Sequence, residues 1–495
     1  MDICLITPPS LFLLDERVFI SLGILKIAAV LEVAGHRVEM LDLSGVENYE
    51  EAVETHMRQS RARVFGITAA TPQMPAVTKI LHVLRNNTAL RVILGGPHVT
   101  LVHAAYQQER NARLSGRATR AFEYLCRQFD TLVAGDGELA VFRAIEPYAP
   151  RVVNADDPKG EFFLTNHQLN IFPLPARHLV DVDSYHYTID GTRATSLIAQ
   201  LGCPFGCGFC GGRNSPSLRR LRTRAASSII DELRHLYTTY GFTGFMFYDD
   251  ELNVNPQIIS LMHDISDLQM SLGVEFRLRG FVKSELFTPE QATAMYHAGF
   301  RWILAGFESG SPRILNNINK SATRDDNTRC VDYAKSAGLK VKALMSLGHP
   351  GESSASVYDT QAWLLDAQPE DFDVTIITTY PGSPYYDNAR EERKGIWTYR
   401  TLGGDALHQY DIDYAEIADY YKGDPNGGYR AYVYTDYLSA EQLVTSRDRV
   451  ETAVRDALHV PFNLGLPAVH FEHSMGQGLP ANIFRTTRLL HDHSE

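Results

Sequence analysis

Three cysteines, Cys203, Cys207 and Cys210, lie close together in a C-x3-C-x2-C spacing. Their loop follows an apolar, strand-like run at residues 195–199, and its proline and glycines let the backbone curl until three thiolates converge. Three soft thiolates without a fourth in register suit a four-iron cluster that keeps one iron open to an exogenous ligand. A structural zinc or a disulfide loop is the alternative. Zinc, however, usually takes a fourth Cys or His nearby, and the next histidine is His235.

Spacing and context together resemble the signature of the radical S-adenosylmethionine (SAM) enzymes, in which a C-x3-C-x-aromatic-C loop follows the first strand of a barrel. Phe209 occupies the aromatic position of that signature. The resemblance implies that the three cysteines hold a [4Fe-4S] cluster, that SAM binds at the open iron, and that Phe209 contacts SAM.

Residues 1 to about 145 alternate between strand-like and helix-like patterns. Strands are predicted at residues 3–7, 37–43, 64–68, 91–94 and 131–134, and helices at residues 23–34, 49–58, 76–85 and 121–129. This alternation predicts a doubly wound, Rossmann-like parallel α/β sheet. Ligands bind such sheets beyond the carboxyl ends of the strands, where this sequence has glycine-rich turns that let the backbone approach a bulky ligand.

The layout resembles the cobalamin (B12)-binding domain that precedes the barrel in one large class of radical SAM enzymes. The resemblance rests on short motifs in a fixed order: Thr7-Pro8-Pro9, Leu22-Gly23, Gly35-His36-x-Val38, Gly95-Gly96-Pro97-His98 and Gly135-x-Gly137-Glu138. It implies the following cobalamin-binding residues: Pro8, Pro9, Thr68, Ala69, Thr71, Gly95, Gly96, His98, Gly135, Asp136, Gly137 and Glu138.

The sequence lacks the D-x-H-x-x-G motif that supplies a histidine to cobalt in other cobalamin proteins. We therefore expect cobalt to have no histidine ligand from that motif, as is usual in this class. His98 could be a ligand, but a position in a loop near the edge of the corrin ring is favoured. The alternative for the whole region is a flavodoxin-like domain that has lost its ligand.

Strand–helix alternation resumes after a stretch rich in proline, aspartate and aromatic residues, 146–190, which is typical of an extended linker. Strands are predicted at residues 195–199, 242–248, 274–278, 302–307, 340–347 and 372–378. Six such units favour the partial (β/α)6 TIM-type barrel of radical SAM enzymes. The predicted organisation is a cobalamin-binding domain (1–145), a linker (146–190), a radical SAM barrel (191–385) and a mixed C-terminal region that forms or caps the substrate pocket (386–495).

Polar residues follow the predicted barrel strands, where barrel enzymes keep their active sites. The family resemblance implies that these residues contact SAM: Asp249, Asp250, Glu251, Arg279, Glu308 and Ser309. The first three would accept hydrogen bonds from the methionine amino group, and Arg279 could pair with the carboxylate. Glu308 and Ser309 would hold the ribose or the amino acid part. Asp249 could instead only cap the next helix, and Arg279 could belong to a buried structural pair.

Other polar residues near the barrel ends have less specific interpretations. For His349, a structural role is favoured over an acid–base role, and the sequence assigns no catalytic acid or base. A basic cluster follows the cysteines and could bind phosphate or lie in a solvated loop: Arg219, Arg220, Arg222 and Arg224.

The bulk properties exclude several partners. The net charge of −12 argues against nucleic acid. No apolar run approaches the roughly 20 residues of a membrane span, and the start of the chain lacks the features of a signal peptide. Cys4, Cys126 and Cys330 lie far apart and are expected as free thiols. We therefore expect a cytoplasmic protein.

The C-terminal region shows no matching strand–helix alternation. Half of the 24 tyrosines fall between Tyr380 and Tyr437. They could line a substrate pocket or cap the barrel, or they could form a packed aromatic core. An amphipathic helix is predicted at residues 440–458.

The resemblance implies a cobalamin-dependent radical SAM methyltransferase that acts through a 5′-deoxyadenosyl radical on an unactivated carbon of a small molecule, such as a natural-product intermediate. The implied cofactors are a [4Fe-4S] cluster, SAM and cobalamin (as methylcobalamin), with a reducing partner such as flavodoxin or ferredoxin. One alternative is a cobalamin-dependent cyclase, ring-contraction or oxidation enzyme without net methylation. Another is a non-catalytic iron–sulfur or cobalamin sensor.

Overall fold

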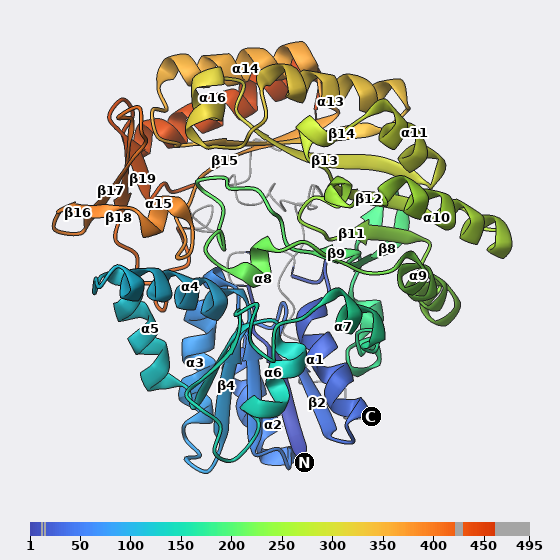
Figure 1. Cartoon of the computed structure of the whole chain (residues 1–495), viewed down its shortest axis with the longest axis vertical. Helices are drawn as coiled ribbons and strands as arrows, with labels where there is room; N and C mark the ends of the chain where they lie inside the picture. Colours follow the sequence, from blue (N-terminus) through green and yellow to red (C-terminus); the bar gives the residue numbers. More distant parts are fainter. Residues whose placement is uncertain (11–12, 14–15, 421–428, 461–495) are drawn as a thin grey trace.

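The structure is a computed structural model that describes residues 1–10, 13, 16–420 and 429–460. Figure 1 shows an N-terminal α/β domain (blue to teal) facing a curled barrel sheet with its helices (green to yellow). Orange and red elements from the C-terminal region lie beside the barrel and along its last strand.

The N-terminal domain is built on a six-stranded parallel sheet of order β2-β1-β3-β4-β5-β6. The strands are β1 (Asp2–Thr7), β2 (Arg37–Asp42), β3 (Val64–Thr68), β4 (Arg91–Gly95), β5 (Thr131–Gly135) and β6 (Val152–Ala155). The helices are α1 (Leu22–Val33), α2 (Tyr49–Gln59), α3 (Met74–Leu84), α4 (Pro97–Asn111), α5 (Arg117–Gln128) and α6 (Gly137–Ala144). The predicted doubly wound fold is confirmed, and the first five strands follow the flavodoxin-like order.

The two faces of this sheet have separate apolar cores because side chains alternate along each strand. In β1, Ile3 and Leu5 pack with α1 and α6, whereas Cys4 and Ile6 pack with α2 and α3. Three elements were missed. Helices α4 and α6 begin directly after Gly96 and Asp136, in motifs that the sequence pattern indicated as turns. Strand β6 lies in the stretch predicted as linker, so the sheet continues beyond residue 145.

The barrel sheet has the order β15-β14-β13-β12-β11-β8-β7. Its strands are β7 (Thr188–Ile189), β8 (Thr192–Leu197), β11 (Gly244–Phe247), β12 (Arg277–Phe281), β13 (Phe300–Glu308), β14 (Lys340–Leu347) and β15 (Asp371–Ile376). Six strands are parallel, and β7 is an antiparallel edge strand. The intervening helices are α9 (Ala226–Tyr240), α10 (Ile258–Leu272), α11 (Pro289–His297), α12 (Pro312–Asn317), α13 (Arg324–Ser336) and α14 (Ser354–Ala367). The predicted partial (β/α)6 barrel is confirmed.

Helix α16 (Ala440–Leu458), predicted at these residues, covers the outer edge of β15. Glu451 accepts a hydrogen bond from the Val374 backbone N–H at 2.6 Å, and the Arg447 guanidinium donates to the Val374 carbonyl at 2.8 Å. An exposed edge strand would present these groups to other chains. Side chains of α16 therefore take the place of a further strand.

The remaining C-terminal elements form an antiparallel sheet of order β16-β17-β18-β19, which the sequence pattern did not reveal. Its strands are β16 (Arg390–Arg393), β17 (Ile396–Arg400), β18 (Ala406–Tyr410) and β19 (Val433–Thr435). Arg117 of α5 joins this region to the N-terminal domain, because it donates to the Tyr386 carbonyl at 2.7 Å and to Gln409 at 2.8 Å. Tyr386, Tyr414 and Tyr420 are buried in an aromatic core against α4 and α5.

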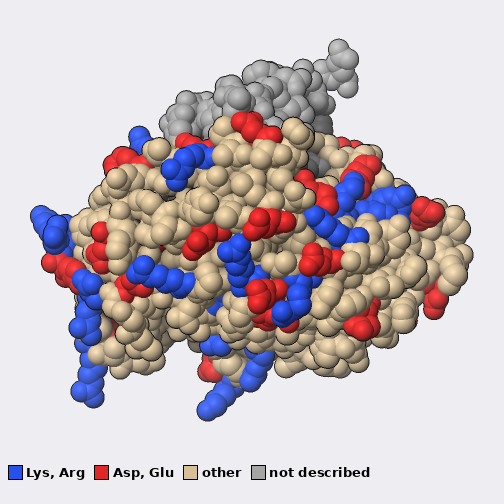
Figure 2. All heavy atoms as spheres, turned by 90° about the horizontal axis from the view of Figure 1, so that it is seen from above, with Lys and Arg blue, Asp and Glu red and all other residues tan. Residues whose placement is uncertain are grey.

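The surface carries charges of both signs. On the face shown in Figure 2, basic and acidic side chains are interspersed. Within the described parts of the chain, every helix is too short or too polar to cross a membrane.

Candidate cofactor and active site

The cysteine loop begins directly after the short strand β9 (Gln200–Leu201), which pairs with β10 (Arg222–Thr223). Asp249, at the end of β11, fixes the chain before the loop, since its carboxylate accepts hydrogen bonds from the backbone N–H groups of Ala199, at 3.0 Å, and Gln200. A side chain at Gly208 would overlap the ring of Tyr385, so only glycine lets the loop pass this close. Local hydrogen bonds and one close approach thus hold the loop at the carboxyl ends of the barrel strands.

The three cysteines fit an iron–sulfur cluster better than a single ion. All are free thiols, and Cys203 and Cys210 remain partly accessible to solvent. Among the described residues, they are not a group whose donor atoms lie within 4.8 Å of one another, the spacing of a single-ion site. In a four-iron cluster each thiolate binds a different iron, so the sulfur atoms lie further apart. Burial raises the pKa of Cys210 to about 12, so forming its thiolate needs a compensating positive charge.

Buried cations surround the loop and supply that charge. Arg213 donates to the carbonyls of Cys203 and Phe205, both at 2.7 Å, and its charge acts on the Cys203 and Cys210 thiols. The positive charge of Lys320, which is 4% exposed, favours the thiolate form of Cys207. The ammonium group of Lys283 lies 4.1 Å from the ring centre of Phe205. Charge-assisted contacts of this kind favour bound anions and thiolates.

A hydrogen-bonded network runs across the ends of β13 and β14. Glu308 has a left-handed backbone (φ 64°) and accepts from Lys320 at 3.2 Å and from Ser346 at 2.7 Å. Ser346 also lies 2.7 Å from Nε2 of His349, whose ring is 5.3 Å from that of Phe209. Burial lowers the pKa of His349 to about 4, so the ring is neutral at pH 7. A strained backbone conformation at a non-glycine residue such as Glu308 is typical of a functional position.

Several polar groups beside the loop have no protein partner. The buried atoms Glu251 Oε2, His349 Nδ1 and Tyr385 OH lack hydrogen bonds. Asp250 is exposed, yet the surrounding protein raises its pKa, as expected for a side chain that lines a hollow. Buried polar atoms are rarely left unpaired, so these atoms point to a polar ligand. The residues present therefore fit SAM, which carries ammonium, carboxylate and hydroxyl groups.

A cavity lies at the carboxyl edge of the N-terminal sheet and extends between the sheet and α1 and α6. Its inner walls are mainly apolar: Ile3, Leu5, Ile24, Ile27, Ile67, Ile93, Val133 and Val141. The mouth is lined by Gly95, Gly96, Gly135 and Gly137, and a side chain at any of the last three would meet neighbouring atoms within 3 Å. The barrel side contributes Ile198, Gln200 and Leu201, next to the cysteine loop. The apolar walls and the glycine mouth, which lets the backbone approach closely, fit a bulky ligand such as cobalamin.

Comparison with known families agrees with both sites. Residues 16–140 match the B12 binding domain, and residues 197–364 match the radical SAM superfamily. The chain is a B12-binding radical SAM protein. These two domains imply a [4Fe-4S] cluster, SAM and cobalamin as its cofactors, in agreement with the sequence-based prediction.

Individual relatives of this B12-binding radical SAM protein are distant. An uncharacterized methyltransferase, PH0819, of Pyrococcus horikoshii is 25% identical over 79% of this chain and 83% of its own length. An anaerobic magnesium-protoporphyrin IX monomethyl ester cyclase of Cereibacter sphaeroides is 23% identical over 69% of this chain, which spans 55% of that enzyme. The radical SAM methyltransferase TsrM of Kitasatospora setae, solved with cobalamin and a [4Fe-4S] cluster, shares the fold, with a TM-score of 0.66 and 17% identity over 91% of this chain and 90% of that one.

The structure brings most of the predicted SAM-contacting residues to the cysteine loop but gives several of them other partners. The Ser309 hydroxyl lies 3.1 Å from that of Thr360 and accepts from the Ser311 N–H. The Asp249 carboxylate is engaged by the backbone, as described above, and does not cap a helix. Arg279 lies inside β12, against the rings of Trp302 and Tyr187. Because Trp302 is near the start of β13, Arg279 does not join the cluster side of the barrel.

The predicted cobalamin residues divide into two groups. Seven line the cavity: Thr68, Gly95, Gly96, Gly135, Asp136, Gly137 and Glu138. Pro8, Pro9, Ala69, Thr71 and His98 lie outside its walls. His98 is in the first turn of α4 rather than in a loop, is 3% exposed, and its Nδ1 is 3.1 Å from the Thr71 hydroxyl. The histidine is thus satisfied within the domain.

Sequence reasoning missed the ion pairs that join the cavity to the barrel. Arg222 pairs with Asp136, and Glu232 bridges Arg177 at 2.9 Å and Arg224 at 2.6 Å. The interpretation of Arg222 and Arg224 as a phosphate patch or a solvated loop is wrong, because both are buried in these pairs. The adjacency of Arg222-x-Arg224 to the cysteine loop was the available signal, but its acidic partners are distant in sequence.

Proposed function

We propose that this protein is a cobalamin-dependent methyltransferase that transfers a methyl group to an unactivated carbon of a small molecule. The observation that supports this proposal is that the N-terminal cavity and the cysteine loop are adjacent. The cavity of the N-terminal domain is walled on the barrel side by Gln200 and Leu201, and the cysteine loop starts at the next residue. Ligands in the two sites would lie side by side, as a reaction that uses both requires.

The two sites would contribute differently. When bound, the cluster and SAM supply the 5′-deoxyadenosyl radical, and cobalamin supplies the methyl group. Cys203, Cys207 and Cys210 would hold the cluster. The glycine mouth at Gly95, Gly96, Gly135 and Gly137, with Thr68, Asp136 and Glu138, would hold cobalamin.

Residues around the loop would orient SAM and keep its charges balanced. Phe209 would pack against SAM, and Asp250 and Glu251 would accept from its ammonium group. Glu308 would accept a ribose hydroxyl while Lys320 and Ser346 fix its orientation. The apolar walls of the cavity would limit the access of water to the reactive groups. A one-electron donor such as flavodoxin or ferredoxin would reduce the cluster.

Methyl transfer is favoured over cyclisation by one comparison. The methyltransferase of Pyrococcus horikoshii aligns along 83% of its length, whereas the chain spans 55% of the Cereibacter sphaeroides cyclase. A cyclase or other radical reaction without net methylation remains the second candidate, supported by that same cyclase alignment.

Product analysis tests the proposal. The full-length protein, reconstituted without oxygen with iron, sulfide and hydroxocobalamin, is incubated with SAM, a strong reductant and a small-molecule extract that supplies the methyl acceptor, and small molecules are quantified by mass spectrometry. A methyltransferase should yield both 5′-deoxyadenosine and S-adenosylhomocysteine, because the first reports radical formation and the second reports methyl transfer from SAM. 5′-Deoxyadenosine without S-adenosylhomocysteine would replace methyl transfer with the second candidate. The absence of both would overturn the enzymatic function and favour a sensor.

A further inference from the structure

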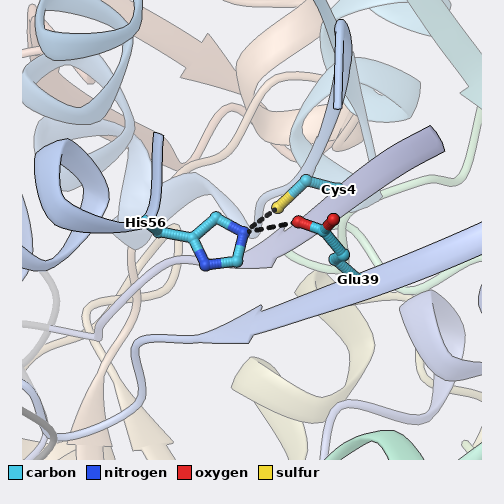
Figure 3. Close-up of side chains that lie close together, drawn as sticks. All are labelled: Cys4, Glu39 and His56. Carbon is cyan, nitrogen blue, oxygen red and sulfur yellow. Dashed lines mark hydrogen bonds and ion pairs between the residues drawn. The ribbon is translucent and has the colours of Figure 1, made fainter. Parts of the chain in front are cut away.

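Three potential metal ligands converge in the N-terminal domain, away from the cysteine loop. Figure 3 shows the Cys4 thiol and the Glu39 carboxylate pointing at the same imidazole nitrogen of His56. The Nε2 atom of His56 lies 3.4 Å from Cys4 Sγ and 3.0 Å from Glu39 Oε2. Among the described residues, this is the one group of three or more such side chains whose donor atoms all lie within 4.8 Å of one another.

The fold holds the three side chains on one face. Cys4 of β1 and Glu39 of β2 are direct partners in the parallel ladder, so their side chains leave the sheet on the same side. His56 comes from α2, which packs on that face. Ser60, at the end of α2, donates its hydroxyl to Glu39 and its backbone N–H to the His56 carbonyl. A hydrogen bond from a neighbouring residue to a ligating carboxylate is a common support of metal sites.

We propose that Cys4, Glu39 and His56 form a binding site for a divalent cation of the zinc class. Thiolate, imidazole and carboxylate together suit zinc and are unsuited to magnesium or calcium. A tetrahedral zinc with ordinary bond lengths separates N from S by about 3.6 Å and N from O by about 3.4 Å. The observed separations of 3.4 and 3.0 Å are close to these values, so small rotations of the side chains would complete the site.

Access and proton balance are compatible with binding. The His56 and Glu39 side chains are 24% and 26% exposed, so an ion can enter from solvent, and water can fill the fourth position. Cys4 is fully buried, and burial beside Glu39 raises the pKa of its thiol, so the thiol is protonated without metal. Zinc binding replaces that proton, which leaves to solvent, while His56 binds as a neutral ring.

The site lies on the opposite face of β1 from the large cavity. Ile3 and Leu5 line the cavity, and Cys4, between them, points to the other side. A bound ion would tie β1, β2 and α2 together behind the cavity wall. This role is independent of the proposed methyl transfer, because Cys4, Glu39 and His56 are absent from both the cavity lining and the cysteine loop.

Metal analysis of the full-length, cluster-loaded protein tests the site. The protein is equilibrated with zinc in the presence of a competing chelator, passed through a desalting column and analysed for zinc by mass spectrometry. The variants are Cys4→Ala, His56→Asn and Glu39→Gln. Cys126→Ala is the matched control, because Cys126 is a partly buried thiol that packs against the same apolar core. We expect one zinc per chain in the wild type and in the control, and at least about tenfold weaker binding in each ligand variant.

X-ray absorption at the zinc edge identifies the ligands. The expected spectrum contains one sulfur at about 2.3 Å and nitrogen or oxygen neighbours at about 2.0–2.2 Å. Three sulfur neighbours would assign the zinc to the cysteine loop and overturn the proposal. Zinc content that is unchanged in His56→Asn and Glu39→Gln would also overturn it. Both replace partly exposed side chains, so they keep the test decisive if Cys4→Ala does not fold.

Discussion

The N-terminal cavity and the hollow at the cysteine loop differ in how they can bind a ligand. The cavity is deep and mostly apolar, and its mouth is made of glycines. The loop is surrounded by charged side chains, among them the buried Arg213 and Lys320 and the partly buried Glu308. Shape and apolar contact therefore dominate in the first site, and charge and hydrogen bonds dominate in the second.

This difference matches what each ligand demands. A large ligand with a bulky, mostly non-reacting body is held well by extensive contact, which is non-directional. A cluster with SAM brings thiolates, a sulfonium and an amino acid head into low dielectric, where each charge needs a partner. If this comparison is right, substitutions in the two sites should separate loss of cobalamin from loss of radical formation.

The largest effect is expected from Cys207→Ala, which removes one of the three thiolates. Without it the cluster should be lost, and 5′-deoxyadenosine formation should fall by at least about 10³-fold. Cobalamin retention, measured by absorbance after gel filtration, should stay at the wild-type level because the cavity is untouched. Cys126→Ala is the control for removal of a thiol. A Cys207→Ala protein that also lost cobalamin would contradict the separation of the two sites.

Gly23→Leu should have the opposite effect to Cys207→Ala: cobalamin binding should weaken while the cluster is retained. Gly23 lines the cavity in α1, has an ordinary backbone conformation, and a Cβ added there would meet no neighbouring atom within 4 Å. A leucine therefore fits the helix, which it favours more than glycine does, and it adds bulk at the cavity lining, where it would compete with a ligand for space. A steric cost of about 1–3 kcal/mol should weaken cobalamin binding by about 5- to 150-fold. Val33→Leu, on the exposed side of α1, is the matched control. Unchanged cobalamin affinity in Gly23→Leu would mean that the ligand does not use this cavity.

Lys320→Met should affect the cluster at the cysteine loop and leave cobalamin binding unchanged. Removal of a buried cation that acts on Cys207 should make the cluster harder to reduce, and 5′-deoxyadenosine formation should slow by about tenfold. The reduction potential, followed by electron paramagnetic resonance, should become more negative. The double variant Lys320→Met/Glu308→Gln checks that an unpaired Glu308 is not the cause. Lys340→Met, at the exposed start of β14, should leave the potential unchanged.

The smallest effect is expected for Glu352, which follows β14 close to His349, and it concerns the pH dependence of stability. Burial raises its pKa to about 7 from an ordinary value of 4.5, so the folded state favours the protonated form. The contribution of Glu352 to the free energy of unfolding is fully present below about pH 4.5 and is lost as the pH rises through 7. The free energy of unfolding changes by at most about 1.4 kcal/mol per pH unit from this group. Thermal unfolding between pH 5 and 8 should show a weaker pH dependence in Glu352→Gln than in the wild type. The exposed Glu370→Gln variant should follow the wild type.

The sequence predicted the fold well because hydrophobic periodicity is local. The six barrel strands and the doubly wound sheet were found from alternation alone, and the glycines at Gly95, Gly96, Gly135 and Gly137 lie where expected. Arg279 was misplaced within its strand, because the strand begins three residues later than the periodicity indicated. The SAM-side partners Lys320 and Ser346, and the pairing of Arg222 with Asp136, could not be predicted. They join residues 12 to 86 positions apart, and only the folded chain brings them together.

The hydrogen bonds from α16 to β15 have a consequence for assembly. A half-open barrel exposes a strand whose free backbone groups can recruit an identical strand from another molecule. Arg447 and Glu451 occupy those groups at Val374, and Arg455 occupies the Phe372 carbonyl. Helix α16 therefore prevents edge-to-edge association of the barrel sheet. A strand from another molecule would first have to displace these polar side chains.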